Sequence, residues 1–135
     1  AMWTVTTSHC FKAAAAGAWI ANWSSYYGEN GIDQWMIPFF GASFYDDPTI
    51  YDKLSPIRTI KDATTPTFVY VGERDVECPS PQSMEFWHGL KAAGVDTSLV
   101  IYDGEGHGIR APEHIKDLSD RTAAWFAKYL GVGGR

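Results

Sequence analysis

The stretch TFVYVGERD, from Thr67 to Asp75, places an apolar run before a glycine and an acidic residue. The stretch TSLVIYDGEGHG, from Thr97 to Gly108, repeats this arrangement and leads to a histidine, His107. Short apolar runs rich in β-branched and aromatic residues and bounded by glycines are typical of buried parallel strands. The sequence therefore predicts two such strands, each followed by a loop that carries an ionisable side chain.

The segment between these strands predicts a helix. Ser80 can cap its start, Pro81 suits the first turn, and Gly94 can end it. The apolar face expected for this helix consists of Met84, Trp87, Leu90 and Ala93. A strand–helix–strand order predicts parallel pairing with a right-handed crossover.

A second helix is predicted to begin at Pro112, after the second strand. Its expected apolar face comprises Ile115, Leu118, Thr122, Trp125, Phe126 and Tyr129. The closing residues GVGGR, 131–135, suggest a frayed tail.

The first half of the chain is less regular. Residues 2–10 suit a helix that ends near His9. The run AAAAGAWI, Ala13 to Ile20, fits either a helix, which alanine favours, or a buried parallel strand; its short and uniformly apolar character favours the strand. Residues 22–62 are aromatic and irregular, and Pro38 argues against one long helix, so short helices are expected there.

Composition predicts one domain over residues 1–135. The 135 residues are 45% apolar with a net charge of −5, and no basic patch indicates a nucleic-acid partner. No apolar run reaches membrane-spanning length, so no membrane association is expected. Cys10 and Cys78 stand apart, and the histidines follow no metal-binding pattern. These features predict no metal and no cofactor, and they favour a cytoplasmic location.

Asp75 and His107 follow neighbouring predicted strands, so both loops should emerge at the carboxyl edge of the sheet. A carboxylate bonded to one ring nitrogen fixes the histidine tautomer and leaves the other nitrogen free to accept a proton. We therefore expect a hydrogen bond between the two side chains. The simpler alternative is that Asp75 caps a turn and His107 is an ordinary loop residue. Glu73, Glu77 and Glu105 are expected to be solvated.

From about Met2 to Leu130 the chain resembles the catalytic domain of the prolyl oligopeptidase family, in particular its dipeptidyl-peptidase and acylaminoacyl-peptidase branches. The family's G-x-x-D, P-x-x-Q-S and E-G-H elements are matched by Gly72 and Asp75, by Pro79, Gln82 and Ser83, and by Glu105, Gly106 and His107. The resemblance implies an α/β-hydrolase fold and a Ser-Asp-His triad in which Asp75 and His107 are catalytic. It also implies that Trp23, Tyr26 and Tyr27 wall an apolar substrate pocket.

One part of the family's pattern is missing, because no G-x-S-x-G occurs in the 135 residues. This departure predicts a truncated α/β-hydrolase fold of about three parallel strands with flanking helices, equivalent to a C-terminal fragment of the catalytic domain. Ser24 and Ser25 adjoin the expected pocket and are the first candidates for a substitute nucleophile. Cys10 and Cys78 come next.

Three functional interpretations remain open. The first is a hydrolase of the serine peptidase or esterase type that cleaves a small acyl ester or peptide with weak activity. The second is a catalytically inactive truncated fragment that folds by self-association, and the third is a module that binds an acyl ligand. An unpaired edge at Ala13 to Ile20 predicts a homodimer or a higher homo-oligomer.

Overall fold

The computed structural model describes residues 1–131 of the chain and has a three-stranded parallel sheet at its centre. The strands are β1 (Ala14–Gly17), β2 (Thr67–Gly72) and β3 (Thr97–Tyr102), in the order β1-β2-β3. Ala14 pairs with Thr67, and Thr67 pairs in turn with Thr97. The predicted parallel sheet is therefore confirmed, with β1 at one edge and β2 in the middle.

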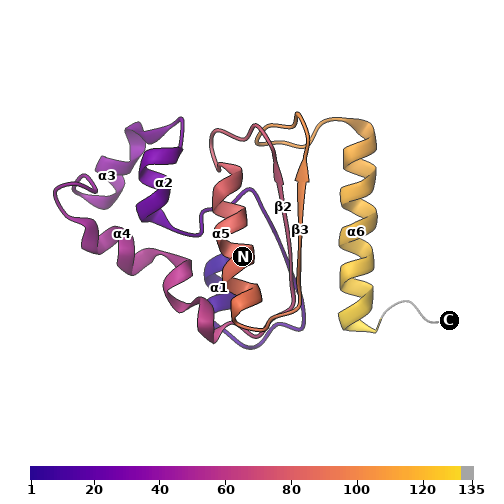
Figure 1. The fold of residues 1–135 in the computed structure, drawn as a ribbon. Coiled ribbons are helices and arrows are strands. Elements are labelled where there is room, and N and C mark those ends of the chain that lie inside the picture. Colours follow the sequence, from indigo (N-terminus) through magenta and orange to yellow (C-terminus); the bar gives the residue numbers. More distant parts are fainter. Residues whose placement is uncertain (132–135) are drawn as a thin grey trace.

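Helices cover both faces of the sheet (Figure 1). Helices α1 (Met2–Thr7) and α5 (Ser80–Ala92) lie on one side, and α6 (Pro112–Leu130) lies on the other. Trp125 of α6 packs on Phe68 of β2 with 6.1 Å between ring centroids, and its indole N–H donates to the carbonyl of Pro66 at 3.4 Å. The predicted apolar face of α6 is only partly covered, since no residue of this helix is fully buried.

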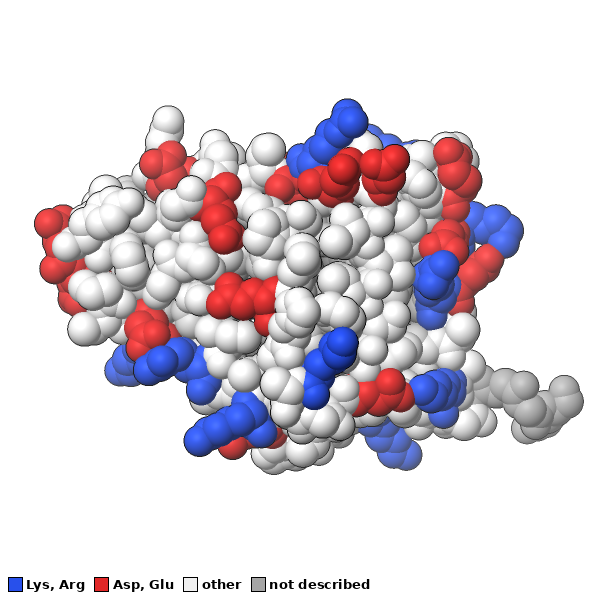
Figure 2. Space-filling model, in the orientation of Figure 1, with Lys and Arg blue, Asp and Glu red and all other residues white. Residues whose placement is uncertain are grey.

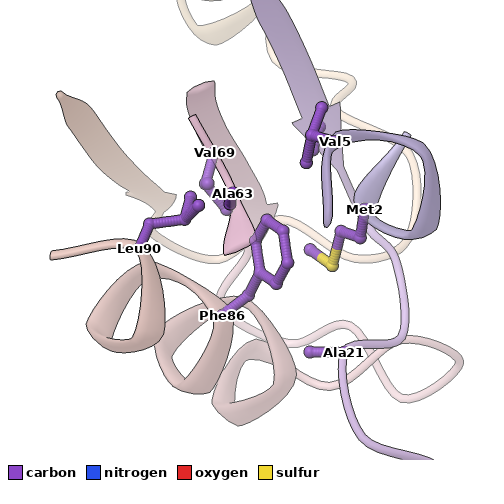
Figure 3. Close-up of a cluster of buried hydrophobic side chains, with 8 residues drawn as sticks. Met2, Val5, Ala21, Ala63, Val69, Phe86 and Leu90 are labelled. Atoms are coloured by element: carbon purple, nitrogen blue, oxygen red, sulfur yellow. The ribbon is translucent and has the colours of Figure 1, made fainter. Parts of the chain in front are cut away.

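The main core lies between the sheet and the α1–α5 side (Figure 3). It unites Met2, Val5, Ala16, Ala21, Ala63, Val69, Phe86 and Leu90. Burying apolar surface stabilises the fold by about 25 cal/mol per Å², so these contacts fix α5 against β2. The carboxyl end of β2 is thereby held in a defined position relative to α5.

Residues 22–62 form an aromatic lobe beside α5 (Figure 1). Its elements are α2 (Trp23–Glu29), the 3₁₀ turn η1 (Asp33–Trp35), α3 (Met36–Phe40), α4 (Pro48–Leu54) and the 3₁₀ segment η2 (Pro56–Asp62). Tyr26, Met36 and Tyr51 are buried at its centre. Asp47 caps α4 by accepting a 3.0 Å hydrogen bond from the N–H of Thr49. The expectation of several short helices is confirmed.

Strand β1 is shorter than the predicted run of Ala13 to Ile20. Ala18 has φ of +51°, a left-handed conformation that ends the extended backbone directly after Gly17. Trp19 follows this turn and is 53% exposed. The chain then leaves the sheet for the aromatic lobe.

The structure also corrects two expectations for α5. Its N-cap is Pro79, no side chain caps its first turn, and Ser80 is the first helical residue. The buried face consists of Gln82, Ser83, Phe86 and Leu90, whereas Met84 is 41% exposed. The apolar pattern was misleading because a polar side chain, Gln82, is buried where it can bond to a distant part of the backbone.

Of the tail predicted from Gly131, residues 132–135 lie outside the described residues. Gly131 itself ends α6 in a left-handed conformation, with φ of +69°. Among residues 1–131, no helix combines the length and the hydropathy required to cross a membrane.

Candidate active site

The loop after β2 holds a buried carboxylate. The side chain of Asp75 has no exposed surface, and its Oδ1 accepts hydrogen bonds from the N–H groups of Glu77 at 2.9 Å and Cys78 at 2.8 Å. A buried charge is tolerated only where hydrogen bonds replace its hydration. The loop therefore folds around this carboxylate and fixes its direction.

Helix α2 and the residues after it support the same loop from the aromatic lobe. The Tyr26 hydroxyl donates to the carbonyl of Glu77 at 2.8 Å, and the N–H of Gly31 donates to the carbonyl of Val76 at 2.7 Å. Burial, with the nearby charges of Cys78, Asp75 and Glu77, raises the pKa of Tyr26 to about 12. The phenol thus stays protonated and remains a donor.

The loop after β3 lies directly against the loop after β2. The N–H of Glu73 donates to the carbonyl of Tyr102 at 2.9 Å, and that of Arg74 donates to the carbonyl of Glu105 at 2.8 Å. Gly104 takes φ of +69°, which allows the chain to turn sharply before His107. Its N–H donates to Oε2 of Glu73 at 2.9 Å. The two loops are thus joined as one unit.

These loops bring Asp75 and His107 into contact, as expected from the strand order. Nδ1 of His107 lies 3.1 Å from Oδ2 and 3.3 Å from Oδ1 of Asp75. The histidine side chain is 46% exposed, and its Nε2 lies 4.0 Å from Oε2 of Glu77, beyond hydrogen-bonding distance. Such an arrangement can hold the proton on Nδ1 and leave Nε2 available to a reacting group.

His107 borders an apolar hollow of about 1040 Å³. The hollow extends from the end of β1, at Gly17, Ala18 and Trp19, to Ile115 and Leu118 of α6. Its other lining residues include Trp3, Trp23, Phe39, Tyr70, Cys78 and Ile109. Of the three predicted pocket residues, Trp23 lines this hollow, whereas Tyr26 and Tyr27 belong to the aromatic cluster of the lobe.

Acidic side chains gather along the edge of the molecule that carries the two loops (Figure 2).

Comparison with known proteins identifies the relatives of this chain. The sequence profile of the prolyl oligopeptidase family matches residues 1–133. The chain belongs to the prolyl oligopeptidase family. Among its relatives, the uncharacterized peptidase YuxL of Bacillus subtilis is 29% identical over 135 residues, which cover 95% of this chain and 20% of that protein. The human acylamino-acid-releasing enzyme is 28% identical over 129 residues, covering 90% of this chain and 18% of that protein.

Solved structures lead to the same family. The uncomplexed acylaminoacyl peptidase of Pyrococcus horikoshii superposes with a TM-score of 0.84 at 29% identity, covering 96% of this chain and 22% of that one. Puromycin hydrolase superposes with a TM-score of 0.88 at 19% identity, covering 98% and 21%, which shows the shared fold. The chain therefore has part of the α/β-hydrolase fold of these peptidases, and it spans about a fifth of the length of the curated relatives it matches.

The two serines predicted as substitute nucleophiles make hydrogen bonds to groups other than His107. The Ser25 hydroxyl donates to Oε2 of Glu85 at 3.0 Å and accepts from Nε2 of Gln82 at 2.9 Å. The N–H of Ser24 donates to Oδ1 of Asn22, the N-cap of α2. Within residues 1–131, no hydroxyl or thiol makes a hydrogen bond to Nε2 of His107.

Gln82, which matches the family's P-x-x-Q-S element, is fully buried and links α5 to the lobe. Its Oε1 accepts from the N–H groups of Ala21 at 3.1 Å and Asn22 at 3.0 Å. Its Nε2 also donates to Oε2 of Glu29 at 2.7 Å. The side chain thereby satisfies backbone donors that would otherwise be buried without partners, which explains why the α5 face includes a polar residue.

The two cysteines differ in their surroundings. Cys78 lines the hollow that His107 borders, but burial and the charges of Asp75 and Glu77 raise its pKa to about 12. Its thiol therefore stays protonated near neutral pH and is a poor nucleophile. Cys10 is exposed, with its Sγ 3.1 Å from Oγ of Ser8.

The expectation that Glu105 is solvated was wrong, since this residue is only 6% exposed. Its Oε1 lies 2.8 Å from Nδ1 of His114, so His107 and His114 bind different carboxylates. In the described part of the chain, no group of three or more His, Cys, Asp or Glu side chains is arranged to hold a metal ion. Glu73 and Glu77 are exposed, as expected.

Proposed function

We propose that this chain carries the acid–base pair of a serine-type hydrolase that cleaves peptide or ester acyl bonds. The observation that supports this proposal best is the contact between Asp75 and His107 beside the apolar hollow. The relatives named acylamino-acid-releasing enzyme and acylaminoacyl peptidase indicate acylated peptides as the substrate class. In this interpretation, residues 1–133 correspond to the part of the family's catalytic domain that supplies the acid and the base.

The proposed reaction uses His107 first as a base and then as an acid. As a nucleophile attacks the carbonyl carbon, its proton moves to Nε2 of His107, and Asp75 stabilises the resulting imidazolium. The C–N or C–O bond then breaks, and the leaving group takes the proton from Nε2. Where the nucleophile is a side chain, water hydrolyses the acylated side chain in a second round with the same proton transfers. Where the nucleophile is water, the first round releases the acid directly.

The hollow is the proposed site for the apolar part of the substrate. Trp23, Phe39 and Tyr70 offer aromatic surface there, and His107 lies at its border. Concave and mostly apolar surfaces with a few polar groups are the usual form of small-molecule sites. The nucleophile is either a side chain brought to Nε2 from outside residues 1–131, a substitute such as Ser24 or Ser25, or water.

Hydrolysis of a short chromogenic ester, acetate or butyrate, tests the role of His107. We expect His107→Ala to lower the rate by about a hundredfold, the usual contribution of a positioned acid–base group. His88→Ala is the matched control, because His88 is exposed on α5 with its ring packed on Trp87. Equal rates for the wild type and His107→Ala would show that hydrolysis does not depend on this pair.

A serine-directed phosphonate probe distinguishes the nucleophiles. Labelling of Ser24 or Ser25, located by mass spectrometry, supports a substitute serine, whereas His107-dependent hydrolysis without labelling favours water. The coding sequence upstream of Met2 gives an independent test, because an in-frame G-x-S-x-G there would identify this chain as part of a complete triad enzyme.

A module that binds an acyl ligand without turnover is the second candidate, and the size and apolar lining of the hollow favour it. Titration calorimetry with an acylated amino acid separates it from the hydrolase. Binding that persists in His107→Ala, with no hydrolysis by the wild type, supports the module. A catalytically inactive, self-associating piece predicts neither binding nor hydrolysis.

A further inference from the structure

The carboxylate of Glu105 is buried although glutamate is usually solvated, and it has three donors. Oε2 accepts from the N–H of Arg110 at 2.9 Å, and Oε1 accepts from the N–H of Ala111 at 2.8 Å and from Nδ1 of His114 at 2.8 Å. The two backbone donors, together with the hydrogen bond from His114, hold the pKa of Glu105 below its usual value. The proposed reaction uses none of these contacts.

These hydrogen bonds hold both ends of the segment 105–111, which carries His107. At the first end of the segment, the N–H of Glu105 donates to the carbonyl of Tyr102 at 3.3 Å. The carbonyl of Glu105 accepts from the N–H of Arg74 at 2.8 Å. At the far end, the Glu105 side chain holds Arg110 and Ala111. His107 lies between these two held ends, two residues after Glu105.

The third donor, His114, is itself held in place on α6. Its ring packs against the ring of Tyr102, with centroids 5.2 Å apart. The Tyr102 hydroxyl donates to Oδ2 of Asp117 at 3.0 Å, and the same oxygen accepts from Nε of Arg121 at 2.6 Å. Glu105 is therefore tied both to its own loop and to the first turns of α6.

We propose that Glu105 is a positioning residue whose carboxylate holds residues 105–111 in the conformation that keeps Nδ1 of His107 on Asp75. This inference rests on the proposed role of Asp75 and His107 as an acid–base pair. Within residues 1–131, the exposed imidazole of His107 makes hydrogen bonds only to the carboxylate of Asp75, so its direction depends on the backbone that carries it. An alternative role for Glu105 is simple stabilisation of the α6 start, since a negative charge is favourable near a helix N-terminus.

The tautomer of His107 distinguishes these two roles, because it reports the contact with Asp75 rather than overall stability. In the ¹⁵N-labelled full chain, long-range ¹H–¹⁵N correlation at a pH where the ring is neutral measures the ratio of Nδ1–H to Nε2–H forms. We expect Glu105→Ala to lower this ratio by about tenfold, as when a hydrogen bond to a charged group is lost. Glu105→Gln should give a smaller change, because its amide oxygen can still accept from some of the donors.

Glu113→Gln is the matched control, since Glu113 is exposed in the first turn of α6. It tests the helix-terminus effect and should leave the tautomer ratio unchanged. A wild-type ratio in folded Glu105→Ala, even with a lower melting temperature, would overturn the proposal. If the amide spectrum shows that Glu105→Ala is unfolded, Glu105→Gln decides by the same criterion.

The measurement needs no turnover, so it separates this inference from the proposed function. A tautomer ratio that depends on Glu105, in a chain without His107-dependent hydrolysis, supports the positioning role and contradicts the hydrolase. A ratio that does not depend on Glu105, in a chain with His107-dependent hydrolysis, overturns the positioning role and leaves the hydrolase supported.

Discussion

Gly72, the last residue of β2, lies so close to Gly106 that a β-carbon at position 72 would be 2.1 Å from the Gly106 carbonyl oxygen. The same β-carbon would also lie 2.5 Å from the carbonyl oxygen of Glu105. Both atoms belong to backbone, so neither can move aside as a flexible side chain would. The close approach of the acid loop and the histidine loop therefore requires a residue without a side chain at this point.

We expect Gly72→Ala to destabilise the fold by about 1–3 kcal/mol, the usual cost of overpacking, and to separate Asp75 from His107. Urea unfolding measures the first effect, and the tautomer ratio of His107 measures the second. Gly28→Ala is the control, because Gly28 is exposed in α2 with nothing within 4 Å of the added carbon. That change should be neutral or stabilising, since alanine favours helix over glycine. Wild-type stability in Gly72→Ala would contradict the close packing.

The lowered pKa of Glu105 predicts an acid-dependent contribution to stability. A carboxyl group whose pKa is lower in the fold than in the unfolded chain stabilises the fold above its unfolded pKa, about 4.3 for glutamate. This contribution is lost as the pH falls from there through the lower pKa in the fold. We therefore expect the stability advantage of the wild type over Glu105→Gln to shrink with acidification.

Urea midpoints of both proteins at a series of pH values measure this difference. Other carboxylates with lowered pKa values, such as Asp96 and Asp117, contribute equally to both proteins and cancel in the comparison. Glu113→Gln provides the baseline for loss of one exposed charge. A difference between the wild type and Glu105→Gln that stays constant across the acid range would contradict the prediction.

Cys78 should resist alkylation although it lines the hollow. With a pKa of about 12, its thiolate fraction at pH 8 is on the order of a thousandfold below that of an ordinary cysteine. Iodoacetamide labelling of Cys10→Ser and Cys78→Ser, followed by mass spectrometry, measures each thiol alone. We expect the exposed Cys10 to react first. Faster labelling of Cys78 would reinstate it as a candidate nucleophile.

We also expect the chain to self-associate, because β1 is an edge strand without a charged residue and the hollow beside it exposes apolar side chains. Light scattering at micromolar concentration should then give a mass above 15.0 kDa. Trp19→Lys, in the lining of the hollow, should shift the chain toward the monomer. Tyr45→Lys, at an 80% exposed position in the lobe, should not. A stable wild-type mass near 15.0 kDa would refute the prediction.

The regular second half of the fold was predictable from local pattern. The strands at Thr67 and Thr97, the intervening helix and the helix from Pro112 all follow from short-range apolar periodicity and from proline and glycine signals. Parallel strands joined by one helix bring their carboxyl ends to the same edge. The meeting of Asp75 and His107 was therefore expected before the structure was known.

The buried polar contacts were decided only by tertiary structure. Gln82 bonds to backbone groups about 60 residues away, at Ala21 and Asn22, and this contact selects which face of α5 is buried. Glu105 is buried because the start of α6 folds back over it, and Tyr26 is buried with its hydroxyl bonded to the carbonyl of Glu77 in the loop after β2. Local periodicity records apolar spacing along one element. A buried polar group depends instead on donors and acceptors that distant segments supply once they are packed together.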